Sequence, residues 1–237
     1  MHGKSSRVHS GTHLWSLACA VLLAPTCASA QDSVRTIGGF SYDAFRVNEE
    51  TAHWILAYDR AAWITSDSVL AAPVDLRAQL GPEWFCLEDR GTWHALYGQY
   101  AAEPDHYRIV FHYQSVSKPS FVSSTAPLDT AQVLAFARAL HRGGAAFPDT
   151  LTRSGLNFNK YIRRLADRTI EVWYLPALQA NGLLAWGAEV RQVYDREGRT
   201  LIGSEVAGAG LQGRYGDTTH LLDIDERARD VPSVGAI

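Results

Sequence analysis

The chain has 237 residues, of which 46% are hydrophobic and 20% are charged, and its formal net charge is −3. This length and composition are ample for a hydrophobic core that needs no disulfide or metal to hold it together. Lysine and arginine form no dense cluster, so we expect neither nucleic acid nor an anionic membrane surface as a partner.

The first thirty residues have the pattern of a secretory signal peptide. Lys4 and Arg7 form a positive head, an apolar run extends from Leu14 to Ala24, and a small-residue site ends at Ala30. The apolar run has 11 residues, whereas a helix that spans a bilayer needs about 20. We therefore expect cleavage after Ala30 and no integral membrane segment in the chain that remains.

Removal of residues 1–30 leaves residues 31–237 as a single exported domain, in the periplasm or outside the cell. The mature chain keeps 20 basic residues against 25 acidic ones, because the signal peptide carries two basic residues and no acidic residue. Cys19 and Cys27 leave with the signal peptide, so Cys86 has no partner for an internal disulfide.

The first predicted element is an amphipathic helix over residues 50–63. Apolar residues recur there at spacings of three and four, which is the period of one helix face. This stripe consists of Trp54, Ile55, Tyr58, Ala61 and Ala62. Pro73 and then Gly81-Pro82 close the region.

The hydrophobic period changes to two over residues 83–116, which is typical of strands. Turn residues divide this region at Asp89-Arg90-Gly91 and again at 102–105. We therefore predict three strands that form an antiparallel meander.

A second helix is predicted over residues 130–142. Asp129 followed by Gln132 has the form of a capping box, and Gly143-Gly144 is expected to end the helix. Its apolar stripe comprises Val133, Phe136, Ala137 and Leu140.

Four more alternating runs follow this helix. The predicted strands cover residues 158–165, 169–175, 185–194 and 199–206. Because strands are grouped before and after one helix, the sequence predicts an α+β fold with an antiparallel β-sheet in two β-meander or hairpin clusters and one or two packed helices. The helix over 130–142 would join the two β lobes, and the tail is expected to be loose from about residue 223.

The second strand cluster is predicted to have one apolar face and one mixed face. The helix over 130–142 should cover the apolar face and bury, in part, Val172, Tyr174, Trp186, Ala188 and Val190. The mixed face carries Glu171, Trp173, Glu189 and Arg191, and we expect it to be left for solvent or for a binding partner. A tryptophan exposed there could stack on a sugar ring or grip an apolar group.

Cys86 and His94 form the candidate catalytic pair. If Asp89-Arg90-Gly91 is a three-residue hairpin loop, Cys86 stands opposite His94 with the two Cβ atoms about 5 Å apart. An imidazole at that distance could take the proton of a thiol nucleophile. The interpretation that we prefer is a small apolar residue inside a strand beside a hydrogen-bonded histidine, because free cysteine is among the most buried residue types.

The histidines offer no metal site. His106 and His112 share one predicted strand face, but six strand residues span about 20 Å. Two imidazole nitrogens on one zinc ion must each come within about 2.1 Å of it. The sequence also contains no zinc-binding helix motif, complete calcium loop, phosphate loop or dinucleotide fingerprint. We therefore predict no metal and no cofactor.

Taken together, these patterns favour a non-catalytic binding or interaction module of a bacterial cell envelope, with an envelope protein or a glycan as its partner. The first alternative is a thiol-dependent hydrolase or transferase that uses Cys86 and His94. The second alternative is a carbohydrate-binding module that uses exposed tryptophan and tyrosine side chains.

Export predicts a defined amino terminus for the mature protein. Amino-terminal sequencing of protein collected outside the cytoplasm should begin at or near Gln31, because cleavage follows the small-residue site. An intact Met1, or a lipid attached to Cys19 or Cys27, would contradict the prediction of a removable signal peptide.

Overall fold

The computed structural model of the chain describes residues 36–37, 40–117, 120–153, 155–177 and 188–207. The predicted signal peptide, Trp186 and the predicted loose tail lie outside these described residues. The helices are α1 (Tyr42–Leu70), α2 (Val74–Arg77), α3 (Thr130–Ala145) and α4 (Asp149–Thr152). The strands are β1 (Thr36–Ile37), β2 (Phe40–Ser41), β3 (Phe85–Asp89), β4 (Thr92–Ala102), β5 (Asp105–Ser117), β6 (Ser120–Ser123), β7 (Phe158–Arg164), β8 (Ile170–Pro176), β9 (Glu189–Tyr194) and β10 (Leu201–Ala207).

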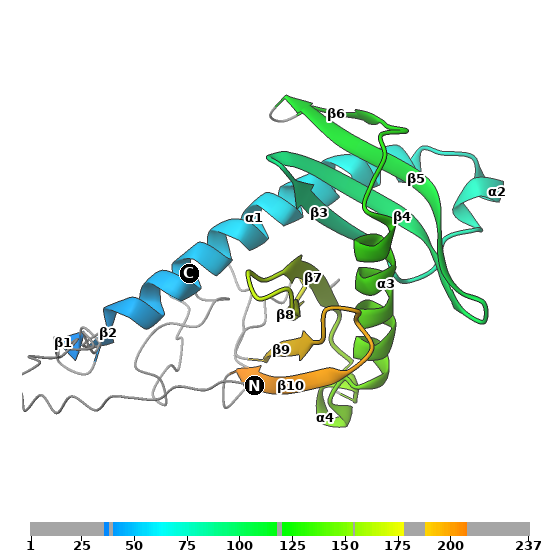
Figure 1. The fold of residues 1–237 in the computed structure, drawn as a ribbon. Coiled ribbons are helices and arrows are strands. Elements are labelled where there is room, and N and C mark those ends of the chain that lie inside the picture. Colours follow the sequence, from blue (N-terminus) through cyan, green and yellow to red (C-terminus); the bar gives the residue numbers. More distant parts are fainter. Residues whose placement is uncertain (1–35, 38–39, 118–119, 154, 178–187, 208–237) are drawn as a thin grey trace, which may run out of the picture. The chain divides into compact units, whose positions relative to one another are not determined.

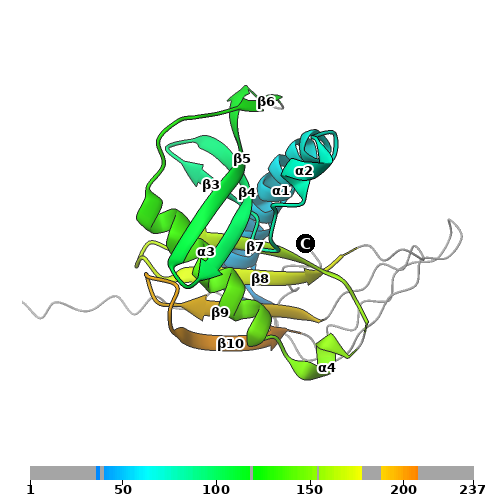
Figure 2. The ribbon, with the colours of Figure 1, turned by 90° about the vertical axis from the view of Figure 1, so that its right-hand side faces the viewer.

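Two four-stranded antiparallel sheets form the frame, with strand orders β3-β4-β5-β6 and β7-β8-β9-β10, beside the small β1–β2 pair (Figure 1). In the chain, each sheet is preceded by a long helix and then by a helix of four residues. The N-cap residue of the short helix is a proline, Pro73 or Pro148. In Figure 2 the strands β7 to β10 lie side by side in chain order, and α3 runs across them. The predicted α+β fold with two β clusters is confirmed.

Helix α1 is longer than the sequence predicts, since it begins at Tyr42 and ends at Leu70. The hydroxyl of Ser41 caps its first turn by accepting a hydrogen bond from the Ala44 amide at 3.3 Å. The added first two turns are mostly exposed and carry no apolar stripe, which is why hydrophobic periodicity did not reveal them. The buried residues of α1 are Thr51, Ile55, Tyr58, Ala61, Ala62, Thr65 and Val69.

Helix α1 packs on both sheets. The ring of Tyr58 meets Trp93 of β4 and Tyr161 of β7 edge to face, with centroid distances of 6.1 and 5.3 Å. About two helical turns further along, the hydroxyls of Thr65 and Tyr97 lie 2.8 Å apart in a buried hydrogen bond. The first sheet and β7 of the second are therefore anchored to one helix.

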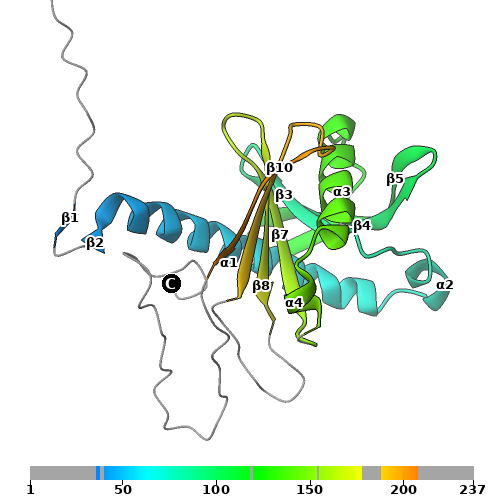
Figure 3. The same ribbon diagram turned by 90° about the horizontal axis from the view of Figure 1, so that it is seen from below.

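Helix α3 and the first half of α1 lie on opposite sides of the β7–β10 sheet (Figure 3). Asp129 caps α3 as predicted, because its side chain accepts hydrogen bonds from the amides of Ala131 and Gln132. The predicted burial under α3 is confirmed for four residues of the second sheet, namely Val172, Tyr174, Ala188 and Val190. Among the described residues, no helix is both long enough and apolar enough to cross a membrane.

The prediction that Gly143-Gly144 ends α3 is wrong, because the helix continues to Ala145. Gly143 is required for packing. A Cβ atom at this position would lie 2.0 Å from the Tyr174 hydroxyl and 2.8 Å from Oε1 of Gln192, whereas at Gly144 it would meet nothing within 4 Å. One glycine thus allows close approach of α3 to the sheet, and the next is exposed.

These adjacent glycines give a matched pair of variants. Gly143→Ala should lower the free energy of unfolding by about 1–3 kcal/mol, because the buried Tyr174 ring must move. Gly144→Ala should raise it by up to about 1 kcal/mol, because alanine has the higher helix propensity. Urea denaturation measures both. Equal effects of the two substitutions would contradict the close approach at Gly143.

Candidate functional site

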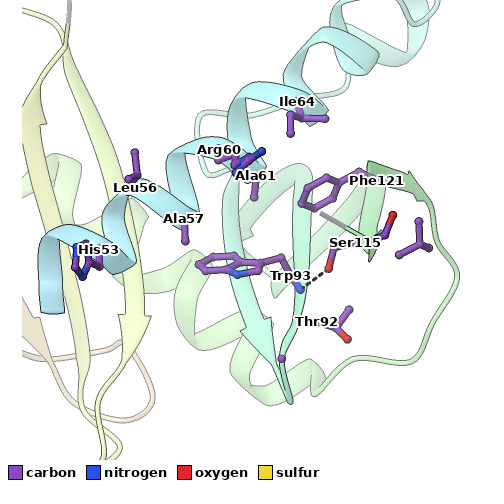
Figure 4. A pocket seen from close by; sticks show the side chains of 13 residues that line it. His53, Leu56, Ala57, Arg60, Ala61, Ile64, Thr92, Trp93, Ser115 and Phe121 are labelled. Atoms are coloured by element: carbon purple, nitrogen blue, oxygen red, sulfur yellow. Dashed lines mark hydrogen bonds between the residues drawn. The ribbon is translucent and has the colours of Figure 1, made fainter. Parts of the chain in front are cut away.

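A pocket of about 370 Å³ lies between α1 and the first sheet, at the end of the sheet where β3 turns into β4 (Figure 4). Its volume is within the range of small-ligand sites, near the lower limit. The helix contributes His53, Leu56, Ala57, Arg60, Ala61 and Ile64. The sheet contributes Gly91, Thr92, Trp93, Ser115, Val116, Ser117 and Phe121.

Small side chains on α1 make this space available. The lining positions of the helix recur at spacings of three and four, so they share one face. Ala57 points toward the ring of Trp93, and the two alanines, Ala57 and Ala61, leave room where larger residues would reach the sheet (Figure 4). Phe121 of β6 closes the far side.

Trp93 is held in place from two directions. Its backbone amide donates a hydrogen bond to Oγ of Ser115 at 2.9 Å, which joins β4 to β5 inside the pocket wall (Figure 4). Its ring lies edge to face with the buried ring of Tyr58 at an interplanar angle of 84°. The aromatic wall of the pocket is therefore preorganised, which lowers the entropic cost of binding an apolar group.

The guanidinium of Arg60 brings a positive charge to the pocket, and the imidazole of His53 adds a hydrogen-bonding group. Arg60 and His53 are exposed on the same side of α1, seven residues apart. None of the ion pairs between described residues includes either of them. The hydroxyls of Thr92, Ser115 and Ser117 add hydrogen-bonding groups at the opposite wall. The site can thus take an apolar group that has a polar or anionic neighbour.

Exposed apolar side chains continue beyond the pocket. Leu56 is 68% exposed and Val116 57%, and both belong to the pocket lining. Trp63 and Leu70, further along α1, are 73% and 66% exposed. A group of large apolar side chains facing solvent is typical of an interaction surface rather than of an ordinary monomer surface.

The loop between β3 and β4 differs from the predicted three-residue loop. It contains only Arg90 and Gly91, with φ of 50° and 81°, and Asp89 pairs directly with Thr92. Two successive positive φ values are those of the tight hairpin turn that matches the twist of paired strands. Arginine is uncommon in this backbone region, so the sequence Asp-Arg-Gly by itself favours the longer loop.

The shorter loop moves the register by one residue, and the predicted pairing of Cys86 with His94 is therefore wrong. Cys86 pairs with Ala95, and His94 pairs with Leu87. Because side chains alternate between the faces of a strand, Cys86 and His94 point to opposite sides of the sheet. The structure does not bring the thiol and the imidazole together.

Cys86 lies in the core under α1. Its side chain is fully buried, and burial raises the pKa of the thiol far above its usual range, with a smaller contribution from the charge of Asp59. A nucleophilic cysteine needs the opposite, a low pKa and access to solvent. The surroundings of Cys86 are those of an apolar core residue.

His94 has a partner that the sequence did not reveal. Its Nδ1 lies 2.9 Å from Nε2 of His112 on β5, so one ring donates a hydrogen bond and the other accepts. His112 pairs with Leu96, two residues along β4 from His94, so the two histidines lie on the same face as diagonal neighbours. Burial lowers the pKa of both, that of His112 to about 4 with His94 as a second cause.

The predicted mixed face of the second sheet is not left for solvent. Trp173 is 9% exposed, Glu171 2% and Glu189 1%, while Arg191 is half-buried. The expectation of an exposed binding face on β8 and β9 is therefore wrong for three of its four residues.

Arginine side chains under α1 explain how this face is closed. Nε of Arg163 and Nε of Arg191 each donate to the Glu171 carboxylate at 2.6 Å. Arg163 also donates to the Thr51 hydroxyl of α1 and lies under the ring of Trp54, 4.6 Å from its centroid. The carboxylate is buried because two cations neutralise it, and the first half of α1, absent from the predicted helix, supplies the cover.

No protein-family model, no curated protein and no solved structure matches the chain. Within the described part of the chain, no group of three or more histidine, cysteine or acidic side chains is placed to hold a metal ion.

The burial of Cys86 predicts slow chemistry at its thiol. In the folded protein Cys86 should react with a maleimide or aromatic disulfide much more slowly at pH 7 than in the urea-unfolded chain, because its thiolate is disfavoured and shielded. His94→Ala should leave this rate unchanged, because the imidazole lies on the other face. Rapid labelling of folded protein that depends on His94 would contradict the structure.

Proposed function

We propose that the protein is a non-catalytic binding module of a bacterial cell envelope, and that the pocket between α1 and β4–β6 takes an apolar group of its partner. The observation that carries this proposal is the coincidence of a preformed aromatic pocket with the exposed apolar side chains around it. The export pattern at the amino terminus supports the envelope as the compartment.

A partner protein suits the pocket better than a buried small molecule does. The rim carries exposed Leu56 and Val116, and the apolar surface extends along α1 to Trp63. Apolar area outside a pocket gains nothing from a ligand that fits entirely inside it, whereas a protein partner covers both the pocket and the rim.

The two alternatives receive less support. A thiol-dependent hydrolase or transferase would need Cys86 and His94 on one face, and they occupy opposite faces of the sheet. A carbohydrate-binding role for Trp173 would need an open ring, and that ring is buried beside Arg191.

The pocket can be tested with an apolar fluorescent anion, 8-anilino-1-naphthalenesulfonate. Dilute protein should bind this probe at one class of site, and Ala57→Phe should weaken the binding about tenfold, equivalent to about 1.4 kcal/mol, because the new ring fills the space beside Trp93.

The matched control is Ala44→Phe, which adds the same ring to an exposed position of α1 outside the pocket. It should leave probe binding unchanged. Undiminished binding to Ala57→Phe, with its far-ultraviolet circular dichroism unchanged, would show that the pocket is not the apolar site and would defeat the proposed function.

A further inference from the structure

A row of large apolar side chains follows the outer face of α1. Leu56, Trp63 and Leu70 are spaced by seven residues, which places them on one stripe of the helix. Their exposed fractions are 68%, 73% and 66%, so the described part of the chain leaves all three open to solvent. Residues seven apart hold the same position in successive heptads, so the three side chains lie along one line of the helix surface.

Two charged residues belong to the same stripe. Arg60 and Asp67 are also seven residues apart, one on each side of Trp63, and both are exposed. Neither takes part in an ion pair between described residues. The stripe therefore presents a positive and a negative group at nearly equal distances from a central tryptophan.

This arrangement is complementary to itself. A twofold axis near Trp63, perpendicular to the helix, would place Leu56 of one copy against Leu70 of the other. The same axis brings Arg60 within about one helical turn of Asp67 of the other copy, and it does so twice. In an isologous interface, the same surface of each copy must carry both partners of every contact. The stripe does so, because it carries both Leu56 and Leu70 and both Arg60 and Asp67.

We propose that α1 is a dimerisation surface whose partner is a second copy of this chain, paired antiparallel through Leu56, Trp63 and Leu70. The inference rests on the proposed function, because Leu56 and Arg60 of the stripe also line the pocket. The antiparallel arrangement carries α2 of one copy past Leu56 toward the His53 end of the other copy's pocket. Val74 and Leu76 of α2 are exposed apolar residues, 71% and 37%, that extend the apolar surface in that direction.

The stripe from Leu56 to Leu70 covers about 21 Å of α1, and the exposed Val74 and Leu76 of α2 extend its apolar surface. A stable dimer buries about 800 Å² on each partner. Trp63 occupies the centre of the surface with charged residues around it, which is the arrangement of an energetic hot spot with a polar rim.

Sedimentation equilibrium of the mature chain, residues 31–237, tests the proposal. At a protein concentration of about 100 μM, the wild-type protein should sediment as a dimer and the Trp63→Glu variant as a monomer. Leu201→Glu, an exposed apolar position on β10, is the matched control and should remain dimeric. Circular dichroism shows whether each variant is folded.

Charge reversal tests the antiparallel pairing itself. In Arg60→Asp both charged positions of the stripe are acidic, and in Asp67→Arg both are basic, so each variant alone should self-associate at least about tenfold more weakly than wild type. An equimolar mixture of the two variants should form a heterodimer, because each acidic position then meets a basic one. The double variant Arg60→Asp/Asp67→Arg should also recover self-association.

A wild-type protein that stays monomeric, a Trp63→Glu variant that remains dimeric, or a mixture that forms no heterodimer would each overturn the proposal. The probe assay on Ala57→Phe is independent of these results. A monomeric wild type with an intact probe site would reject the second copy as partner and leave the pocket standing. Restored association in the mixture without a probe site would reject the pocket instead.

Discussion

The two sheets meet at the side chain of Tyr58, and no backbone ladder between described strands joins them. Strands β3 and β7 lie side by side, yet they belong to separate sheets, so no described backbone ladder links them. Tyr58, 1% exposed, fills this junction and touches aromatic rings of both sheets, Trp93 and Tyr161. Burial of one ring against two others supplies area and directional aromatic contact at the same point. The placement of α1 follows from this contact.

Because Tyr58 fixes the position of α1, the other faces of the helix contact defined parts of the molecule. Its first half covers Arg163, which with Arg191 neutralises the buried Glu171. The face of α1 that carries Ala57 and Ala61 lies over the first sheet, and these small side chains leave the pocket open above Trp93. The remaining face points to solvent and carries the stripe of Leu56, Trp63 and Leu70. One helix thus holds the core, shapes the pocket and presents the outer surface, and the proposed binding function relies on all three.

The sequence predicted most of the elements and missed what depends on register and on distant cover. Alternation identified the strands and the cap at Asp129 identified α3, since both signals are local. The predicted length of the β3–β4 loop was wrong because Asp-Arg-Gly fits two loop lengths. Arg90 also adopts a positive φ that arginine rarely takes. Gly98 is required where β4 passes close to β5, because a Cβ there would lie 2.1 Å from the Arg108 carbonyl oxygen. The pocket carried no signal, since its residues come from segments far apart in the chain.

The central claim is that Tyr58 and α1 couple the two sheets into one cooperative unit, and amide hydrogen exchange in Tyr58→Leu tests it most directly. The slowest-exchanging amides of β3–β6 and of β7–β10 should lose protection by the same free energy, about 2 kcal/mol, because each sheet would unfold with the other. Val47→Ala, at an exposed position of α1 outside the pocket and the stripe, should leave protection in both sheets unchanged. Loss of protection in one sheet, with wild-type protection kept in the other, would contradict the account.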